Sequence, residues 1–289
     1  MAYALKPIGT RHDGVAIAQE LDTILCQARE EQWDVGAVVT DDAGQCGRAR
    51  RILALRWPNI AFLHCFAHDI NNLVKAVLKT TFRHVACRAA DIVNALNAAS
   101  STWLKQLRDI MERRYNKRLA LYALCETRWN SMQACFASLL RVRKALEILC
   151  CEYSGVTKFP APLLVLKEAQ FWKDLAEAES TIRPLSAASY CLQRDQNTVA
   201  DVVASYRNIY CKFSANSEHR EALLPLVDQR WRKCEQPLFM LGYFLHPRYV
   251  DKARQLPITS ISLPAASHIS QSTTTVVLSA PTSATFAIV

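Results

Sequence analysis

The sequence predicts an α/β protein that is mostly helical, and three observations support this prediction. A short apolar run at residues 37–39 ends in two carboxylates and a turn at Gly44, and a second apolar run covers residues 61–65. A basic segment of helical character separates the two runs, which gives the order strand, helix, strand. Beyond Asp69, apolar residues recur at helical spacing along most of the chain.

Each of the first elements has a local signal. Residues 13–29 carry apolar side chains on one helical face, and Asp13 precedes them as a helix N-cap. The strand at residues 37–40 leads into a basic helix at 48–57, and the strand at 61–65 follows it. The sheet is therefore expected in the first part of the chain.

Helices dominate the remainder. They are predicted at residues 71–80, at 82–107 as one or two helices, and at 128–151, 163–179, 199–213 and 218–245. Proline is expected to break the fourth of these helices near Pro184 and to interrupt the last at Pro225 and Pro237. Residues 154–162 contain one glycine and two prolines, which predicts a loop.

The composition favours a protein with a large core and a polyanionic partner. The 289 residues are 51% hydrophobic and 21% charged, and the formal net charge of +9 favours nucleic acid above other partners. We find no apolar run of about 18 residues, the length a membrane helix needs, so no membrane partner is expected. The eleven cysteines are odd in number and scattered, and no signal peptide precedes them. Reduced thiols are therefore expected rather than disulfides.

Asp41 and Asp42 are the first candidates for chemistry because they follow a buried strand. Open α/β sheets place their ligands at the carboxyl ends of strands, and a carboxylate there can bind Mg²⁺. In this interpretation one of the two binds the metal and the other caps the next helix. The alternative is that both are turn residues, a common role for aspartate before a helix.

A second group of residues has the spacing of a zinc site. Cys65 and His68 are followed by His84 and Cys87. The segment between the two pairs has helical periodicity and lacks the turns of a zinc finger. Packing of these side chains in the core is therefore the interpretation we prefer to zinc binding.

The third group precedes the helix predicted at residues 128–151. Arg128 can pair with a phosphate and Trp129 can stack on an exposed base, while Thr127 can cap the helix. The alternative is a tryptophan packed at a helix start beside a solvated arginine. Further basic residues could line a phosphate-binding face or form ordinary solvated helix faces. They are Arg48, Arg50, Arg51, Arg56, Arg113, Arg114, Lys117, Arg118, Arg141, Arg143 and Lys144.

The order of these motifs resembles that of hAT-superfamily transposases. The first shared segments are Val38-Val39-Thr40-Asp41, Cys65-x-x-His68 with Asn71-Asn72-Leu73, and Thr127-Arg128-Trp129-Asn130-Ser131. The later ones are Phe171-Trp172, Arg183-Pro184-Leu185, Leu192-Gln193-Arg194-Asp195, Thr198-Val199-Ala200-Asp201 and Phe244-Leu245-His246-Pro247-Arg248-Tyr249. The resemblance covers roughly residues 1–252, and its specificity lies in the shared order of several motifs.

The resemblance implies a partial ribonuclease-H-like α/β core at residues 1–68 and a mainly helical region with an insertion domain at 69–257. A tail at residues 258–289 lies outside the resemblance. The tail contains no charged residue, which predicts a disordered or irregular segment. The resemblance also implies a site at which three carboxylates hold Mg²⁺ and cut DNA. In that site Asp41 would correspond to the second acidic residue and would be a metal ligand.

Other residues match the family's motifs in the same way. Cys65 and His68 match its CxxH motif, and Arg128 with Trp129 matches a pair whose tryptophan stacks near a flipped base. Thr127 and Asn130 belong to that same motif. The partners implied are DNA and other transposase chains, and the implied compartment is the nucleus.

The sequence also departs from the family pattern. Asp41 is the one acidic position that matches, and residue 42 is Asp where the family more often has Asn. We therefore expect a transposase-derived chain, truncated at both ends and without cleavage activity, that retains DNA binding. The alternatives are a nuclease whose missing carboxylates come from another chain, and a transposon remnant without function.

Overall fold

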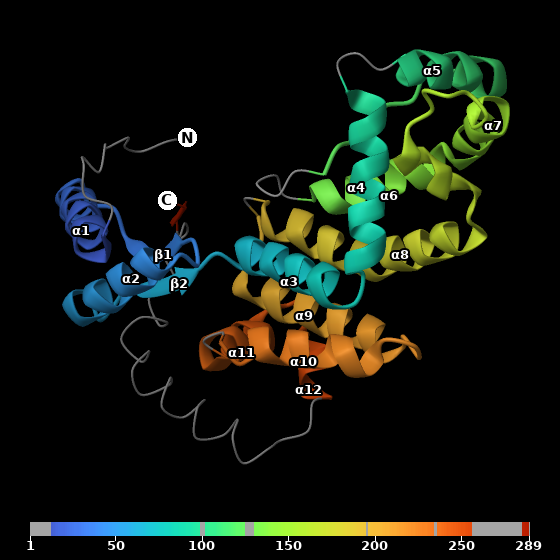
Figure 1. Ribbon diagram of the computed structural model, residues 1–289. Coiled ribbons are helices and arrows are strands. Elements are labelled where there is room, and N and C mark those ends of the chain that lie inside the picture. Colours follow the sequence, from blue (N-terminus) through green and yellow to red (C-terminus); the bar gives the residue numbers. More distant parts are fainter. Residues whose placement is uncertain are drawn as a thin grey trace. The chain divides into compact units, whose positions relative to one another are not determined.

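The computed structural model describes residues 13–98, 102–124, 130–194, 196–233 and 236–255 and the backbone of residues 285–288. The protein is mostly helical and contains a small parallel sheet (Figure 1), so the predicted α/β, mostly helical fold class is confirmed. The chain divides into two compact units. Unit 1 comprises Met1–Asp69, Thr198–Val203 and Arg232–Val289, and unit 2 comprises Ile70–Asn197 and Ala204–Trp231.

Unit 1 begins with the predicted succession of helix and strand. Its first elements are α1 (Gly14–Glu30), β1 (Val35–Thr40), α2 (Gly44–Arg56) and β2 (Ala61–His64). Strands β1 and β2 are parallel, and their register runs from Ala37 opposite Ala61 to Thr40 opposite His64. Strand β3 (Thr285–Ile288) pairs with the other edge of β1, so the strand order is β2-β1-β3.

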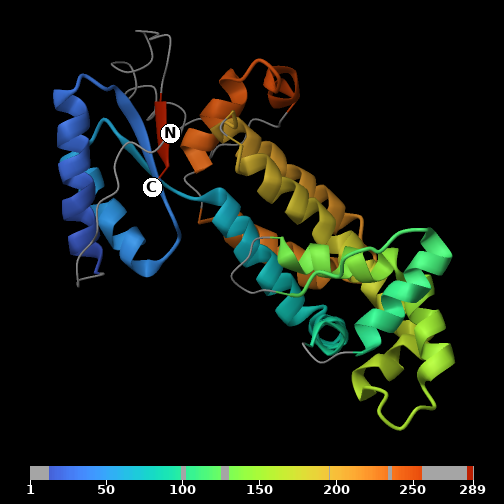
Figure 2. The ribbon, with the colours of Figure 1, turned by 90° about the horizontal axis from the view of Figure 1, so that it is seen from above.

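Helices α1 and α2 pack with the sheet around one apolar cluster (Figure 2). The Asp13 carboxylate caps α1 by accepting hydrogen bonds from the amides of Val15 (2.9 Å) and Ala16 (3.0 Å), as the sequence predicts. The two helices approach closely at Gly14, where a Cβ would lie 2.6 Å from the Cβ of Arg48. The cluster consists of Ala18, Leu21, Leu25, Val38, Ala49, Leu53 and Phe62.

Unit 1 also contains described helices from later in the chain. They are the start of α9 (Val199–Ser214), α11 (Gln236–Leu245) and α12 (Val250–Arg254). The ring of Phe239 in α11 meets that of Phe66 edge to face, at 4.7 Å between centroids. Apolar and aromatic contacts of this kind connect segments that lie far apart in the sequence.

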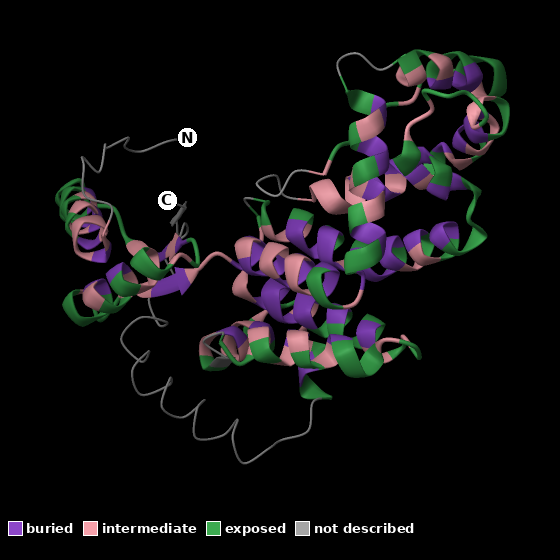
Figure 3. Ribbon diagram, in the orientation of Figure 1, coloured by how far each residue is buried: buried purple, intermediate pink, exposed green. Residues whose placement is uncertain are grey.

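Unit 2 is a helical bundle whose buried residues lie along the inner faces of its helices (Figure 3). Its longest helix, α8, buries Trp172, and the indole Nε1 of Trp172 donates to the carbonyl of Leu166 at 2.9 Å. The elements are α3 (Phe66–Thr80, from residue 70), α4 (Arg83–Asn97), α5 (Thr102–Tyr115), α6 (Ser131–Arg141), α7 (Arg143–Tyr153), the 3₁₀ helix η1 (Ala161–Lys167), α8 (Ala169–Leu192), α9 from residue 204, and α10 (Arg220–Trp231).

Two predicted helix breaks are wrong. Helix α8 continues through Pro184, and α10 continues through Pro225. A proline removes one hydrogen bond to the carbonyl four residues earlier. In both helices that carbonyl belongs to an exposed residue, Ser180 or Glu221, where water can replace the lost donor. Burial of the flanking side chains then outweighs the loss of one bond.

Candidate functional site at the carboxyl end of β1

Asp41 directly follows β1, at the edge of the sheet where the parallel strands β1 and β2 both end. The side chain is exposed. The amide of Cys65, the first residue after β2, donates to the carbonyl of Thr40 at 2.6 Å. The fold therefore brings the acidic strand end and the start of the Cys65-x-x-His68 motif to the same edge, the location where such sheets bind ligands.

The Asp41 carboxylate accepts hydrogen bonds from the turn that follows it. Its Oδ1 accepts from the amide of Ala43 at 2.9 Å, and the thiol of Cys46 donates to the same carboxylate. The bond from Cys46 is the main cause that lowers the pKa of Asp41, with the charges of His68 and Arg50 contributing less. Asp41 is therefore ionised at neutral pH, and protein donors already occupy part of its acceptor capacity.

Cys46 and Arg50 hold this turn from the side of α2. Burial and the bond to Asp41 raise the pKa of Cys46 to about 11, so its thiol keeps the proton that it donates. The Arg50 Nη1 donates to the carbonyl of Asp41 at 2.6 Å and to the hydroxyl of Thr40 at 2.5 Å. Sequence reasoning missed both partners. Their spacing of five and nine residues from Asp41 is a signal only once α2 is known to begin at Gly44.

Asp42 lies beside the same arginine, with 3.9 Å between its Oδ1 and the Nη2 of Arg50. The sequence interpretation gave one aspartate a metal and the other a capping role. In the structure Asp41, the residue proposed as the metal ligand, accepts a turn hydrogen bond from the amide of Ala43, and the N-cap of α2, Ala43, has no side-chain cap. The turn interpretation of Asp41 therefore has direct structural support.

Cys65 and His68 are both half-buried, and His68 lies in the first turn of α3. Within the described parts of the chain, the one grouping of three side chains suited to a metal is Glu177, Glu218 and His219. Neither residue of the Cys65-x-x-His68 motif, nor His84 or Cys87, belongs to such a grouping. Core packing is nevertheless wrong for His84 and Cys87, since both side chains are exposed on α4. For the half-buried Cys65 and His68 it stays a prediction.

The predicted DNA-binding pair falls outside the described residues. Thr127, Arg128 and Trp129 are not among them, so their role stays a prediction. Asn130 precedes α6 with a left-handed backbone, φ 59°, and its carbonyl accepts from the amide of Ala134 at 3.1 Å. Its side chain makes no capping hydrogen bond to the helix.

The basic residues fall into two kinds. Several are tied to protein acceptors: Arg113 pairs with Glu152, Arg118 with Glu112, both Arg143 and Lys144 with Glu147, and Arg141 donates to the carbonyl of Ala120. Others are exposed side chains on α2 and near the end of α5. They are Arg48, Arg51, Arg114 and Lys117, whereas Arg56, also exposed, pairs with Asp22 at 2.8 Å. These exposed cations are the ones best suited to phosphate contacts.

The strand end can therefore supply the ionised carboxylate of Asp41, flanked by a thiol, an arginine and a histidine, and the carboxylate of Asp42 follows it in the chain. Cleavage with two metal ions needs several carboxylates around the ions. As far as the structure describes the chain, none joins Asp41 in a grouping of three possible ligands.

Comparisons with known proteins leave the family of the chain a prediction. No protein-family model matches the sequence, and a search of curated proteins gives no match. In the described part of the chain, no helix has both the length and the apolar character needed to span a membrane.

Proposed function

We propose that this chain is a DNA-binding protein derived from an hAT-type transposase, and that it does not cleave DNA by itself. The observation that carries the proposal is the position of Asp41 at the carboxyl end of β1, beside the Cys65-x-x-His68 motif. A long helical region with the Arg128-Trp129 pair follows in the order found in that family. The same order supports a partial ribonuclease-H-like core as the origin of the β1-α2-β2 unit.

Charge supports the DNA-binding part of the proposal. The chain carries a formal net charge of +9, and exposed arginines and lysines occur in both units. Each cation that neutralises a phosphate releases condensed counterions from the DNA, so affinity should fall steeply as salt increases. Trp129 would add stacking on an unpaired base, which is tolerant of sequence.

The bonding of Asp41 supports the absence of cleavage. Its carboxylate accepts from the Ala43 amide and the Cys46 thiol, and Arg50 lies beside it. A metal ion at this position would compete with these donors and would meet a neighbouring positive charge. One carboxylate in such surroundings is a weak site for ions that must bridge a phosphodiester.

A second candidate function is a metal-dependent nuclease in which other chains complete the site. The exposure and lowered pKa of Asp41 favour it, because an ionised carboxylate at a strand end is available to a partner. In this case Mg²⁺- or Mn²⁺-dependent DNA cleavage would be lost in Asp41→Asn and kept in Asp42→Asn. DNA binding without cleavage under the same conditions supports the first proposal instead.

The experiment that tests binding is fluorescence anisotropy with a labelled duplex that ends in a single-stranded overhang. Trp129→Ala should weaken binding about 5- to 140-fold, because stacking on a base contributes about 1–3 kcal/mol. Trp33→Ala is the matched control, since Trp33 is 49% exposed and belongs to unit 1. Equal affinities for wild type and both variants would refute the assignment of Trp129, and absence of any binding would refute the function.

A further inference from the structure

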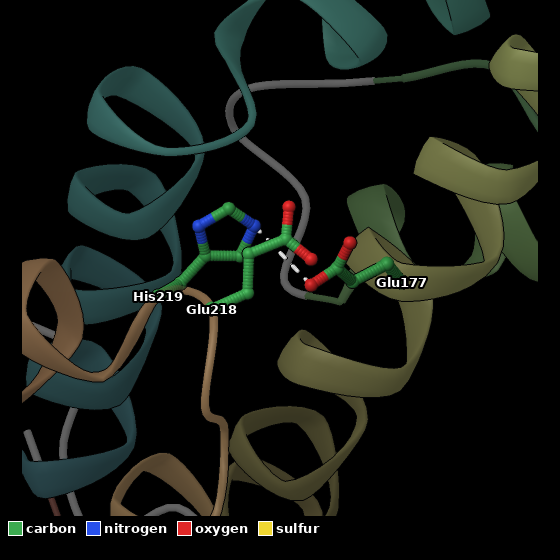
Figure 4. A group of neighbouring side chains, drawn as sticks. All are labelled: Glu177, Glu218 and His219. Carbon is green, nitrogen blue, oxygen red and sulfur yellow. Dashed lines mark ion pairs between the residues drawn. The ribbon is translucent and has the colours of Figure 1, made fainter.

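Glu177, Glu218 and His219 bring three potential metal-ligating atoms together in unit 2 (Figure 4). Glu177 projects from α8, whereas Glu218 and His219 precede α10. Each side chain offers one ligand atom, and all three atoms lie within 4.8 Å of one another. The His219 Nε2 is 3.2 Å from the Glu177 Oε1, the dashed pair in Figure 4.

Neighbouring residues hold the backbone of the Glu218–His219 segment and the ring of His219 in place. The Asn216 Oδ1 accepts from the amides of Glu218 (3.1 Å) and His219 (2.8 Å), which sets the backbone of the segment before α10. The imidazole of His219 packs edge to face on the ring of Phe82, at 5.1 Å between centroids. Glu177 and His219 are both half-buried, whereas Glu218 is exposed and can rotate toward them.

The negative charges of Glu177 and Glu218 favour a cation between them. Two carboxylates so close together repel one another unless a positive charge lies between them. A divalent ion held by all three residues would supply that charge.

We propose that Glu177, Glu218 and His219 bind a divalent transition-metal ion of the Zn²⁺ class. Imidazole together with carboxylate favours such ions over Mg²⁺ and Ca²⁺, which prefer oxygen ligands alone. Ligand atoms around tetrahedral Zn²⁺ lie about 3.4 Å apart, given bonds of about 2.1 Å. Closing the group to that spacing requires movement of little more than 1 Å, about the scale of one rotamer adjustment of the exposed Glu218. Three protein ligands leave the fourth position to water or to a further ligand.

The test is titration of the purified full chain with ZnCl₂ against a competing chromophoric chelator, under reducing conditions. The expected result is one tight equivalent, with affinity reduced about tenfold or more in Glu218→Gln and in His219→Gln, since even outer-sphere partners of a metal contribute that much. The matched control carries the same chemical change on an exposed glutamate of unit 2, Glu221→Gln, and should keep the wild-type affinity.

The outcomes separate the proposal from its competitors. Zinc binding that is unchanged in Glu218→Gln and His219→Gln would assign the metal to cysteines elsewhere and overturn the proposal. Absence of a tight equivalent would leave only the contact between His219 and Glu177, which also overturns the proposal. Because His219 also packs on Phe82, His219→Gln could fail to fold. Glu218 is exposed, so Glu218→Gln decides the question in that case.

Discussion

Tyr249→Phe tests how the Thr198–Asp201 segment is joined to the Phe244–Tyr249 segment in unit 1. The hydroxyl of Tyr249 donates to Asp201 Oδ1 at 2.6 Å, while Asp201 Oδ2 accepts from the amide (2.8 Å) and hydroxyl (3.0 Å) of Thr198. Asp201 is only 9% exposed, so water has little access to the oxygen that would lose its donor. The ring of phenylalanine retains the stacking on Tyr243 that the tyrosine makes at 5.1 Å.

The substitution therefore isolates one hydrogen bond to a buried carboxylate. Hydrogen bonds to charged groups contribute about 1.5–3 kcal/mol, and we expect a loss of about 2 kcal/mol in the free energy of unfolding. Equilibrium urea unfolding followed by circular dichroism measures it, summed over both transitions if the two units unfold separately. Tyr210→Phe, at a tyrosine that is 43% exposed, is the control and should change little. A loss below about 0.5 kcal/mol in Tyr249→Phe would refute the reasoning.

Three further predictions concern the same unit. Asp41→Ala should lower the free energy of unfolding by about 1 kcal/mol, because the Ala43 amide loses its turn acceptor. Asp41→Asn keeps an acceptor oxygen and should lower it by less than half as much; equal losses in the two variants would contradict the turn role. Gly242→Ala should lower the free energy of unfolding by about 1–3 kcal/mol, because the added Cβ would lie 2.3 Å from Val199 Cγ2. Adding Val199→Ala to this variant should recover most of that stability. An unchanged melting temperature in Gly242→Ala alone would contradict this packing. Burial pushes the pKa of Asp201 upward, but its hydrogen bonds outweigh burial and the net pKa lies below its ordinary 3.8. The ionised Asp201 therefore contributes its full stability above pH 3.8 and loses that contribution as the pH falls through the lower folded pKa. The stabilities of wild type and Asp201→Asn should converge in acid. A constant difference in stability between them from about pH 6 to pH 2 would contradict this prediction.

The fold class could be predicted because its signals are local. Asp13 caps α1 as expected, and the apolar runs at residues 37–39 and 61–65 form β1 and β2. The breaks predicted at Pro184 and Pro225 fail because burial along α8 and α10 is a property of the tertiary structure. The local sequence shows that a proline removes a helical hydrogen bond. It does not show the burial of neighbouring side chains that compensates for the lost bond.

The sequence could predict where the candidate site at Asp41 lies, but not which residues form hydrogen bonds with Asp41. Asp41 lies at the strand end that the sequence indicates, but its partners Cys46 and Arg50 depend on where α2 begins and on how its first turns face the strand. The grouping of Glu177 with Glu218 and His219 has no sequence signal, because it depends on α8 meeting the segment before α10. Contacts between distant segments require the three-dimensional structure.

The most direct test of the proposed function is the salt dependence of DNA affinity. Dissociation constants for one labelled duplex with an overhang would be measured for the full chain across a series of KCl concentrations. The account predicts a linear fall of log affinity with log salt, with a slope of about −3 or steeper, which corresponds to three or more neutralised phosphates. A slope near zero, or no measurable affinity at the lowest salt, would contradict the claim that this basic chain binds DNA.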